Sequence, residues 1–147
     1  MDAPTRGERN NNPGNIDYLP DIQYLGEVGI EEVLPGGRPR FAKFDTPVHG
    51  IRALARNLLA YQKLHKLYTL REIVTRWAPG SENDTAAYID AVCKDTGFGP
   101  DISVNLFLTD NLIAVVIAII RHENGRCIYT NATVRDGVRE AYIGFPQ

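Results

Sequence analysis

TDNLIAVVIAIIRHENG, residues 109–125, is the stretch that decides the fold, because residues 112–120 are apolar without interruption. A helix with no polar stripe is either buried on every side or crosses a membrane. A membrane span needs about 20 apolar residues, and this run is too short. The stretch therefore predicts the buried central helix of a folded domain. Thr109 or Asp110 is a suitable N-cap, and Gly125 suits the left-handed position that ends a helix.

Glu123 lies at the end of this predicted helix, which is an unusual place for an acidic residue. The negative end of the helix dipole disfavours a carboxylate there, and so do Ile119 and Ile120 one turn earlier. Both effects favour the protonated carboxyl, which is the form that a general acid needs. Arg121 or Arg126 would act in the opposite direction by pairing with Glu123. Because an exposed ion pair is screened by solvent, we expect burial and the dipole to prevail.

Composition excludes several classes of protein. The 147 residues are 44% hydrophobic and 23% charged, which is typical of one globular domain with a substantial core. The formal net charge of −2 and the pI of about 5.9 argue against a general nucleic-acid binder. Cys93 and Cys127 lack metal-ligand spacing, so we expect neither a metal site nor a cofactor, and their pairing stays open. The first residues lack the basic and apolar segments of a signal peptide.

Residues 6–18, RGERNNNPGNIDY, are dense in turn-forming residues and show no helical or strand period. The proline of Asn-Pro-Gly-Asn presets its backbone angle and the glycine permits a positive φ, which is a strong turn signal. Residues 11–15, the Asn loop, therefore form either a simple surface turn or a rigid loop that presents side-chain amides. In the second case, a sugar ligand suits the donors and acceptors of Asn11, Asn12 and Asn15.

Residues 22–44 contain short apolar stretches broken by glycine and proline, which predicts a small β-hairpin or an irregular flap. Asp45-Thr46-Pro47 then supplies a cap and a first-turn proline for a helix. Apolar residues at spacings of three and four give this helix one face toward the core. Its other face, with Arg52, Arg56 and Lys63, is expected to be solvated.

Two capping boxes predict the next helices. Thr69 with Glu72 opens a short helix, and Ser81 with Asp84 opens another over residues 85–94. Four residues form the expected apolar side of the second helix: Ala87, Tyr88, Ala91 and Val92.

The sequence contains no P-loop, dinucleotide-binding, serine-hydrolase or zinc-protease motif, and its histidines form no triad with cysteine or serine. The chemistry that is left to consider is that of carboxylates in amide-rich and aromatic surroundings, which is typical of glycoside cleavage. Glu82 is a candidate for a second catalytic carboxylate beside Glu123, and Asp84 is a weaker one. An acidic residue in the first turn of a helix is also favoured simply because it interacts with the positive end of the helix dipole. Glu82 is therefore either a catalytic residue or only a partner of the dipole, and both interpretations stay open.

Four motifs resemble a small family encoded by tailed bacteriophages and prophages: RGERNNNPGNI, FDTPVHGIRALA, RWAPGSENDTAAYI and IIRHENG. They extend over residues 6–125, most of the chain, and four separated motifs in one order are hard to obtain by chance. Members of this family are described as virion structural proteins or as lysozyme-like virion proteins that degrade peptidoglycan. In that family the position of Glu8 is usually apolar, so Glu8 is not a catalytic candidate.

A more distant similarity, to the flagellum-associated glucosaminidases of the lysozyme superfamily, implies roles for individual residues. There the catalytic glutamate ends a buried helix in a setting similar to IIRHENG, which implies Glu123 as the acid. An Asn- and Gly-rich segment and a tyrosine-bearing helix line their sugar groove, and the Asn loop and Tyr88 look like the counterparts. The glutamate precedes the Asn/Gly segment there and follows it here, so the resemblance implies a permuted arrangement.

We therefore predict a single lysozyme-like domain over residues 1–147, of class α+β and mostly helical, with a small β or loop lobe. It would cleave peptidoglycan glycan strands as a muramidase, glucosaminidase or lytic transglycosylase, delivered in a phage virion to the host cell wall. We expect its partners to be peptidoglycan and other phage virion or tail proteins, with no nucleic acid and no membrane insertion. The alternative is a non-enzymatic virion component that keeps the fold for binding or assembly. A groove onto which Glu123 opens, walled by the Asn loop and Tyr88, favours the enzyme.

Overall fold

The computed structural model describes residues 2–33, 35–80 and 83–146. Within them the chain is mostly helical with one small antiparallel sheet, so the predicted α+β, mostly helical class is confirmed. The elements in chain order are α1 (Arg6–Arg9), β1 (Glu27–Ile30), β2 (Ala42–Phe44), α2 (Pro47–His65), α3 (Leu70–Trp77), α4 (Thr85–Thr96), α5 (Thr109–Asn124) and α6 (Asn131–Tyr142). Cys93 and Cys127 are free thiols. No helix in the described ranges is long and apolar enough to span a membrane.

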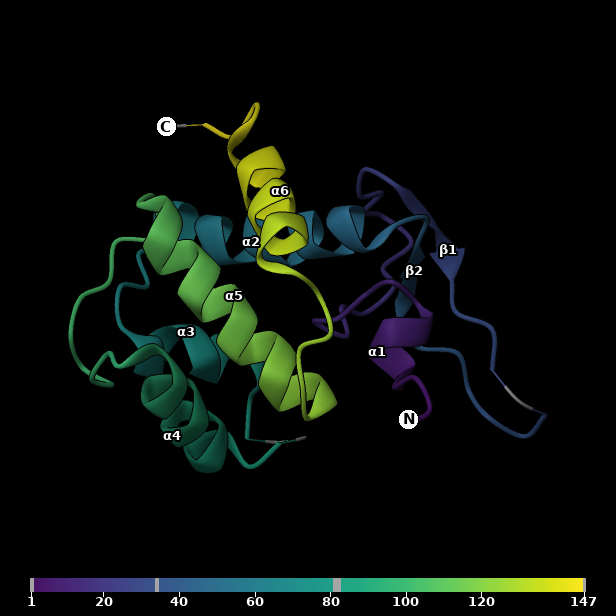
Figure 1. Cartoon of the computed structure of the whole chain (residues 1–147), viewed down its shortest axis with the longest axis horizontal. Coiled ribbons are helices and arrows are strands. Elements are labelled where there is room, and N and C mark those ends of the chain that lie inside the picture. Colours follow the sequence, from purple (N-terminus) through teal and green to yellow (C-terminus); the bar gives the residue numbers. More distant parts are fainter. Residues whose placement is uncertain (1, 34, 81–82, 147) are drawn as a thin grey trace.

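Helix α5 runs across the middle of the helical part, next to α2, while the hairpin of β1 and β2 projects on the other side (Figure 1). Leu112, Val116 and Ile120 of α5 are fully buried. Ile113 and Ile117 are only partly buried, so the expected burial on every side is wrong for this face. These two residues lie one turn apart, on a stripe that the neighbouring helices do not fully cover.

The two ends of α5 differ. Leu108 is the N-cap and makes no side-chain capping bond, so the predicted caps Thr109 and Asp110 are wrong. Both residues fall inside the first helical turn, where Asp110 still meets the positive end of the dipole. Gly125 ends the helix with a φ of 75°, which confirms the predicted left-handed position.

Helix α2 begins at the predicted cap, Thr46, and packs closely along α6. Gly137 of α6 permits this approach, because a Cβ there would lie 2.6 Å from the Ile51 side chain. Arg56 is not simply solvated as expected. Its Nε donates to the Ala141 carbonyl at 2.8 Å, which satisfies one of the free carbonyls at the end of α6.

The predicted capping box of Thr69 and Glu72 is confirmed at the start of α3. The second predicted box is wrong, because Asp84 is itself the N-cap of α4 and its carboxylate accepts from the Ala87 N–H at 3.1 Å. Ser81 lies outside the described residues. An aspartate cap satisfies a first-turn N–H as well as serine does, so α4 begins only after Asp84.

The buried side of α4 matches the prediction only in part. Tyr88 and Val92 are buried as expected, and Ile89 joins them. Ala87 and Ala91 are exposed instead. Tyr88 is thus the largest side chain that α4 places in the core, where it faces the end of α5.

The predicted hairpin within residues 22–44 is confirmed. Strands β1 and β2 pair antiparallel, with Glu27 opposite Phe44. The Ala42 N–H also donates to the Ile16 carbonyl at 2.9 Å, so the chain leaving the Asn loop runs along β2. The hairpin of β1 and β2, called the small lobe from here on, therefore holds the C-terminal end of the Asn loop.

A buried carboxylate, Glu31, joins this hairpin to α1. Arg6 pairs with both carboxylate oxygens (Nε–Oε1 2.8 Å, Nη2–Oε2 2.5 Å), and the Asn10 amide donates to Oε1 at 3.1 Å. The backbone N–H groups of Arg40 and Phe41 donate to Oε2 at 2.9 and 2.8 Å. The Arg6 guanidinium above all, and then the backbone donors, lower the pKa of Glu31 to about 2. One ionised carboxylate thereby fixes the lobe beside the Asn loop.

Candidate active site

The Asn loop packs against the start of α2. Asn11 and Asn15 both have left-handed backbones, with φ of 51° and 52°, a conformation that asparagine tolerates better than most residues. Gly50 of α2 makes room for the loop, because a Cβ there would lie 1.8 Å from the Asn11 carbonyl oxygen. The loop is therefore a fixed part of the fold and not an independent surface turn.

Two of the three predicted amides point into the structure. Asn12 is fully buried, and its Nδ2 donates to the carbonyls of Ile16 (3.0 Å) and Ala42 (2.8 Å). The Asn11 amide donates to the Phe44 carbonyl at 3.1 Å. Both amide hydrogens of Asn12 are already bound to main-chain carbonyls inside the protein, which corrects its expected role as a sugar ligand. Asn11 uses one of its two amide hydrogens in this way, and its role toward a sugar stays a prediction.

Asn15, Tyr88 and Glu123 meet at the end of α5. The Asn15 amide donates to Glu123 Oε1 at 2.9 Å, and the Tyr88 hydroxyl donates to Oε2 at 2.8 Å. Each carboxylate oxygen thus accepts a hydrogen bond from a neutral donor. Three residues from the Asn loop, α4 and α5 are brought together, and the orientation of the Glu123 side chain is fixed.

Tyr88 contacts Glu123 from the core of the protein. Only 1% of the tyrosine is exposed, so it is not the groove wall that the similarity implied. Burial, and after it the Glu123 carboxylate, raise the pKa of Tyr88 far above its ordinary value, while a bond from Trp77 acts in the opposite direction. Tyr88 therefore keeps its proton and is the donor. The exposed His122 ring stacks on it, with the ring centroids 3.8 Å apart.

Asn124, the residue after Glu123, ties the Asn loop to α5. Its Nδ2 donates to the Pro13 carbonyl at 2.8 Å and to the Ile120 carbonyl at 2.9 Å. Its Oδ1 accepts from the Thr5 hydroxyl at 2.6 Å. The sequence patterns do not single out Asn124, and the available signal is only an amide next to the candidate acid.

The arginines close to Glu123 in sequence pair with other residues. Arg121 contacts Asp95 at 3.1 Å. Arg126 binds both oxygens of Glu8, at 2.7 and 3.0 Å, and this guanidinium lowers the pKa of Glu8. Glu8 is therefore an ion-pair partner and a helix cap, and neither arginine neutralises Glu123.

A groove of about 490 Å³ opens beside Glu123 and Asn15. It lies between the helical part and the small lobe, and residues of both line it. The aromatic residues of its walls are Tyr24, Phe41, Tyr61 and Trp77, and the amides are Asn15, Asn57 and Asn83. Rings that cover apolar faces, together with a few polar groups that fix orientation, suit a ligand such as a sugar.

Comparison with known proteins assigns the chain to a family. No family model matches it. Protein P5 of Pseudoalteromonas phage PM2 is 39% identical over 146 residues, which cover 98% of this chain and 86% of that protein. This chain belongs to the P5 family of phage proteins. The relationship supports the predicted place in a phage virion, whereas the lysozyme-like fold and the cleavage of peptidoglycan stay predictions.

In this P5-family chain, Asp17 shares the groove with Glu123. Asp17 pairs with Arg40, with 2.7 Å between Nε and Oδ1, and both side chains are half-exposed. The sequence patterns missed Asp17, although it follows the Asn loop closely. Glu82 lies outside the described residues. Asp84 caps α4 and is not among the residues that line the groove.

Proposed function

We propose that this P5-family protein is a virion enzyme that cleaves the glycan strands of peptidoglycan, with Glu123 as the general acid. One observation carries the proposal: Glu123 ends α5, is held by Asn15 and Tyr88, and opens onto an aromatic and amide-lined groove. A lysozyme-like fold is part of the proposal. It is supported by the place of the groove, between a helical part and a small β lobe with the acid at the end of a buried helix.

Glu123 gives its proton to the glycosidic oxygen as the bond breaks and positive charge develops on the sugar ring. A protonated carboxyl keeps acceptor capacity on both oxygens, so the bonds from Asn15 and Tyr88 persist while the O–H points to the substrate. Neither donor competes for that proton, because the amide is neutral and Tyr88 holds its own. Their role is to hold the acid in place.

Asp17 takes the second role in this proposal, either stabilising the oxocarbenium-like transition state or activating water. Its support is its position on the groove wall and the Arg40 guanidinium that orients it. Glu82 is the rival for this role on sequence grounds. Asp17→Asn and Glu82→Gln, assayed side by side, decide between them: we expect a loss of about 10²-fold for the true partner and little for the other.

Loss of turbidity of purified peptidoglycan tests the proposal. Wild type should clear the suspension, and Glu123→Gln, which keeps the shape but has no proton to donate, should lower the rate by about 10²–10⁴-fold. Glu32→Gln is the matched control, because Glu32 is 91% exposed and does not line the groove. Melting curves should coincide for all three proteins. A Glu123→Gln protein that clears peptidoglycan at the wild-type rate would remove Glu123 from the mechanism.

A non-enzymatic virion role is the second candidate, and the relationship to a phage protein supports it. Strand β1 also offers an apolar surface to other virion proteins, with Val28 61% and Ile30 42% exposed. In this case wild type leaves peptidoglycan intact. Val28→Ser and Ile30→Ser then reduce incorporation of the protein into particles, whereas Glu123→Gln does not.

A further inference from the structure

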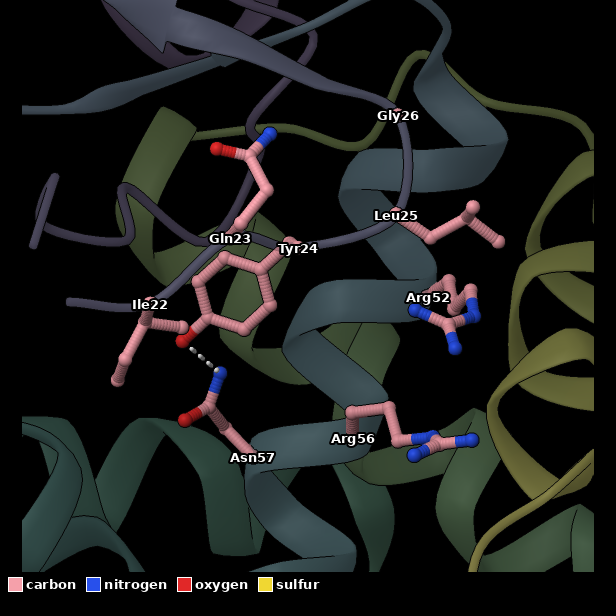
Figure 2. A pocket seen from close by; sticks show the side chains of 8 residues that line it. All are labelled: Ile22, Gln23, Tyr24, Leu25, Gly26, Arg52, Arg56 and Asn57. Carbon is pink, nitrogen blue, oxygen red and sulfur yellow. Dashed lines mark hydrogen bonds between the residues drawn. The ribbon is translucent and has the colours of Figure 1, made fainter. Parts of the chain in front are cut away.

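A second cavity, of about 790 Å³, lies beside the groove. Tyr24 and Asn57 line both spaces, and the Asn57 amide donates to the Tyr24 hydroxyl at 3.1 Å between them. Figure 2 shows this bond on one side of α2, with Arg52 and Arg56 further round the helix. A ligand that fills the groove can therefore continue past the Tyr24–Asn57 bond into this cavity.

Two arginines give the cavity a positive charge. Arg52 and Arg56 lie one turn apart on α2, a spacing at which like charges destabilise a helix. Among the residues that the structure describes, no acidic one lines the cavity. The Arg56 guanidinium donates to the carbonyls of Ala141 and Ile143, whereas no hydrogen bond or ion pair engages the Arg52 guanidinium within the described ranges. Burial, and after it the charge of Arg52, lower the pKa of Arg56.

The facing wall of the cavity is apolar and fixed. Ile22 and Leu25 are 43% and 53% exposed there. Gly26 follows them with a φ of 79°, and a Cβ at this position would lie 2.2 Å from the His49 ring. The Gly26 carbonyl also accepts from the Asp45 N–H at 2.9 Å. This wall is therefore preformed and does not need a ligand to order it.

We propose that this cavity binds the peptide stem of peptidoglycan, with the Arg52 guanidinium on a stem carboxylate, while the attached glycan lies in the groove beside Glu123. The inference rests on the proposed function, since it assigns a further part of the same substrate. Peptide stems combine small apolar side chains with free carboxylates. These two features match the exposed faces of Ile22 and Leu25 and the positive charge of the Arg52 guanidinium.

Binding of soluble fragments tests this inference without relying on cleavage. Calorimetry compares three ligands: a disaccharide with its peptide stem, the same compound with the stem carboxylates amidated, and the bare disaccharide. Wild type should bind the first roughly tenfold more tightly than the other two, and raised salt should reduce this preference. Arg52→Gln should abolish the preference. Arg52 is the residue to change, because Arg56 also holds the end of α6.

Arg135→Gln is the matched control, because Arg135 is exposed on α6 and lines neither cavity. It should keep the full preference for the peptide-bearing ligand. An Arg52→Gln protein that keeps it too would overturn the inference, and so would a wild type that binds all three ligands equally. A wild type that clears peptidoglycan but ignores the stem would contradict this inference alone. A wild type that prefers the stem but cleaves nothing would contradict only the proposed activity.

Discussion

Glu31 and Glu123 both use a carboxylate to join distant parts of the chain, but the charges of their partners differ. Glu31 is 4% exposed, and a guanidinium and backbone donors neutralise it inside the protein. Glu123 accepts from the neutral donors Asn15 and Tyr88 and faces a groove. The first arrangement leaves nothing for a ligand, whereas the second leaves room for a proton and a substrate. Burial and hydrogen bonding alone therefore do not identify a catalytic acid.

Removing Glu31 should have the largest effect on stability. Glu31→Ala leaves Arg6, Asn10 and two backbone N–H groups without their acceptor, so the free energy of unfolding should fall by about 3 kcal/mol. Urea unfolding measures this. Glu32→Ala is the control, since the adjacent Glu32 is 91% exposed and should change stability by less than about 0.5 kcal/mol. If Glu31→Ala unfolds at the same urea concentration as wild type, Glu31 and its hydrogen-bond donors do not hold the small lobe in place.

The same carboxylate predicts a pH dependence. Its pKa of about 2 in the folded protein lies below the ordinary 4.5, so Glu31 stabilises the fold fully above about pH 4.5 and loses this contribution as the pH falls toward 2. Arg6 is 41% exposed, and solvent screening limits the effect to about 2 kcal/mol. Unfolding curves between these pH values should show a steeper loss for wild type than for Glu31→Gln. Parallel curves would assign the acid sensitivity to other groups.

Local signals predicted most of the elements, because capping and periodicity act within one or two turns. Thr46, Gly125 and the Thr69–Glu72 box are of this kind. The meeting of the Asn loop, α4 and α5 followed only from the resemblance, since no local pattern brings such distant residues together. Asp17 and Asn124 were missed for the same reason: their places depend on how the hairpin and the Asn loop pack on α5.

Within the Asn loop, Asn12 and Asn15 should separate stability from activity. Asn12→Ala removes three buried hydrogen bonds with Ile16 and Ala42 and should cost about 2 kcal/mol of unfolding free energy. Asn15→Ala removes one donor to Glu123 at a half-buried site, so it should cost under about 1 kcal/mol and slow clearance of peptidoglycan roughly tenfold. Melting curves and turbidity assays on both variants check this. Equal losses of stability would put both amides in the same structural role.

Tyr88→Phe is the smallest change and the sharpest test of the Glu123 site. It keeps the buried ring and its stack on His122 and removes only the hydroxyl that donates to Glu123, so stability should fall by about 1 kcal/mol or less. Held by Asn15 alone, the acid spends less time aimed at the substrate, and turnover should drop roughly tenfold. The loss should fall on kcat and not on KM, because a tyrosine that is 1% exposed touches no glycan. A raised KM with unchanged kcat would instead make Tyr88 a substrate-binding residue, as the glucosaminidase similarity implied.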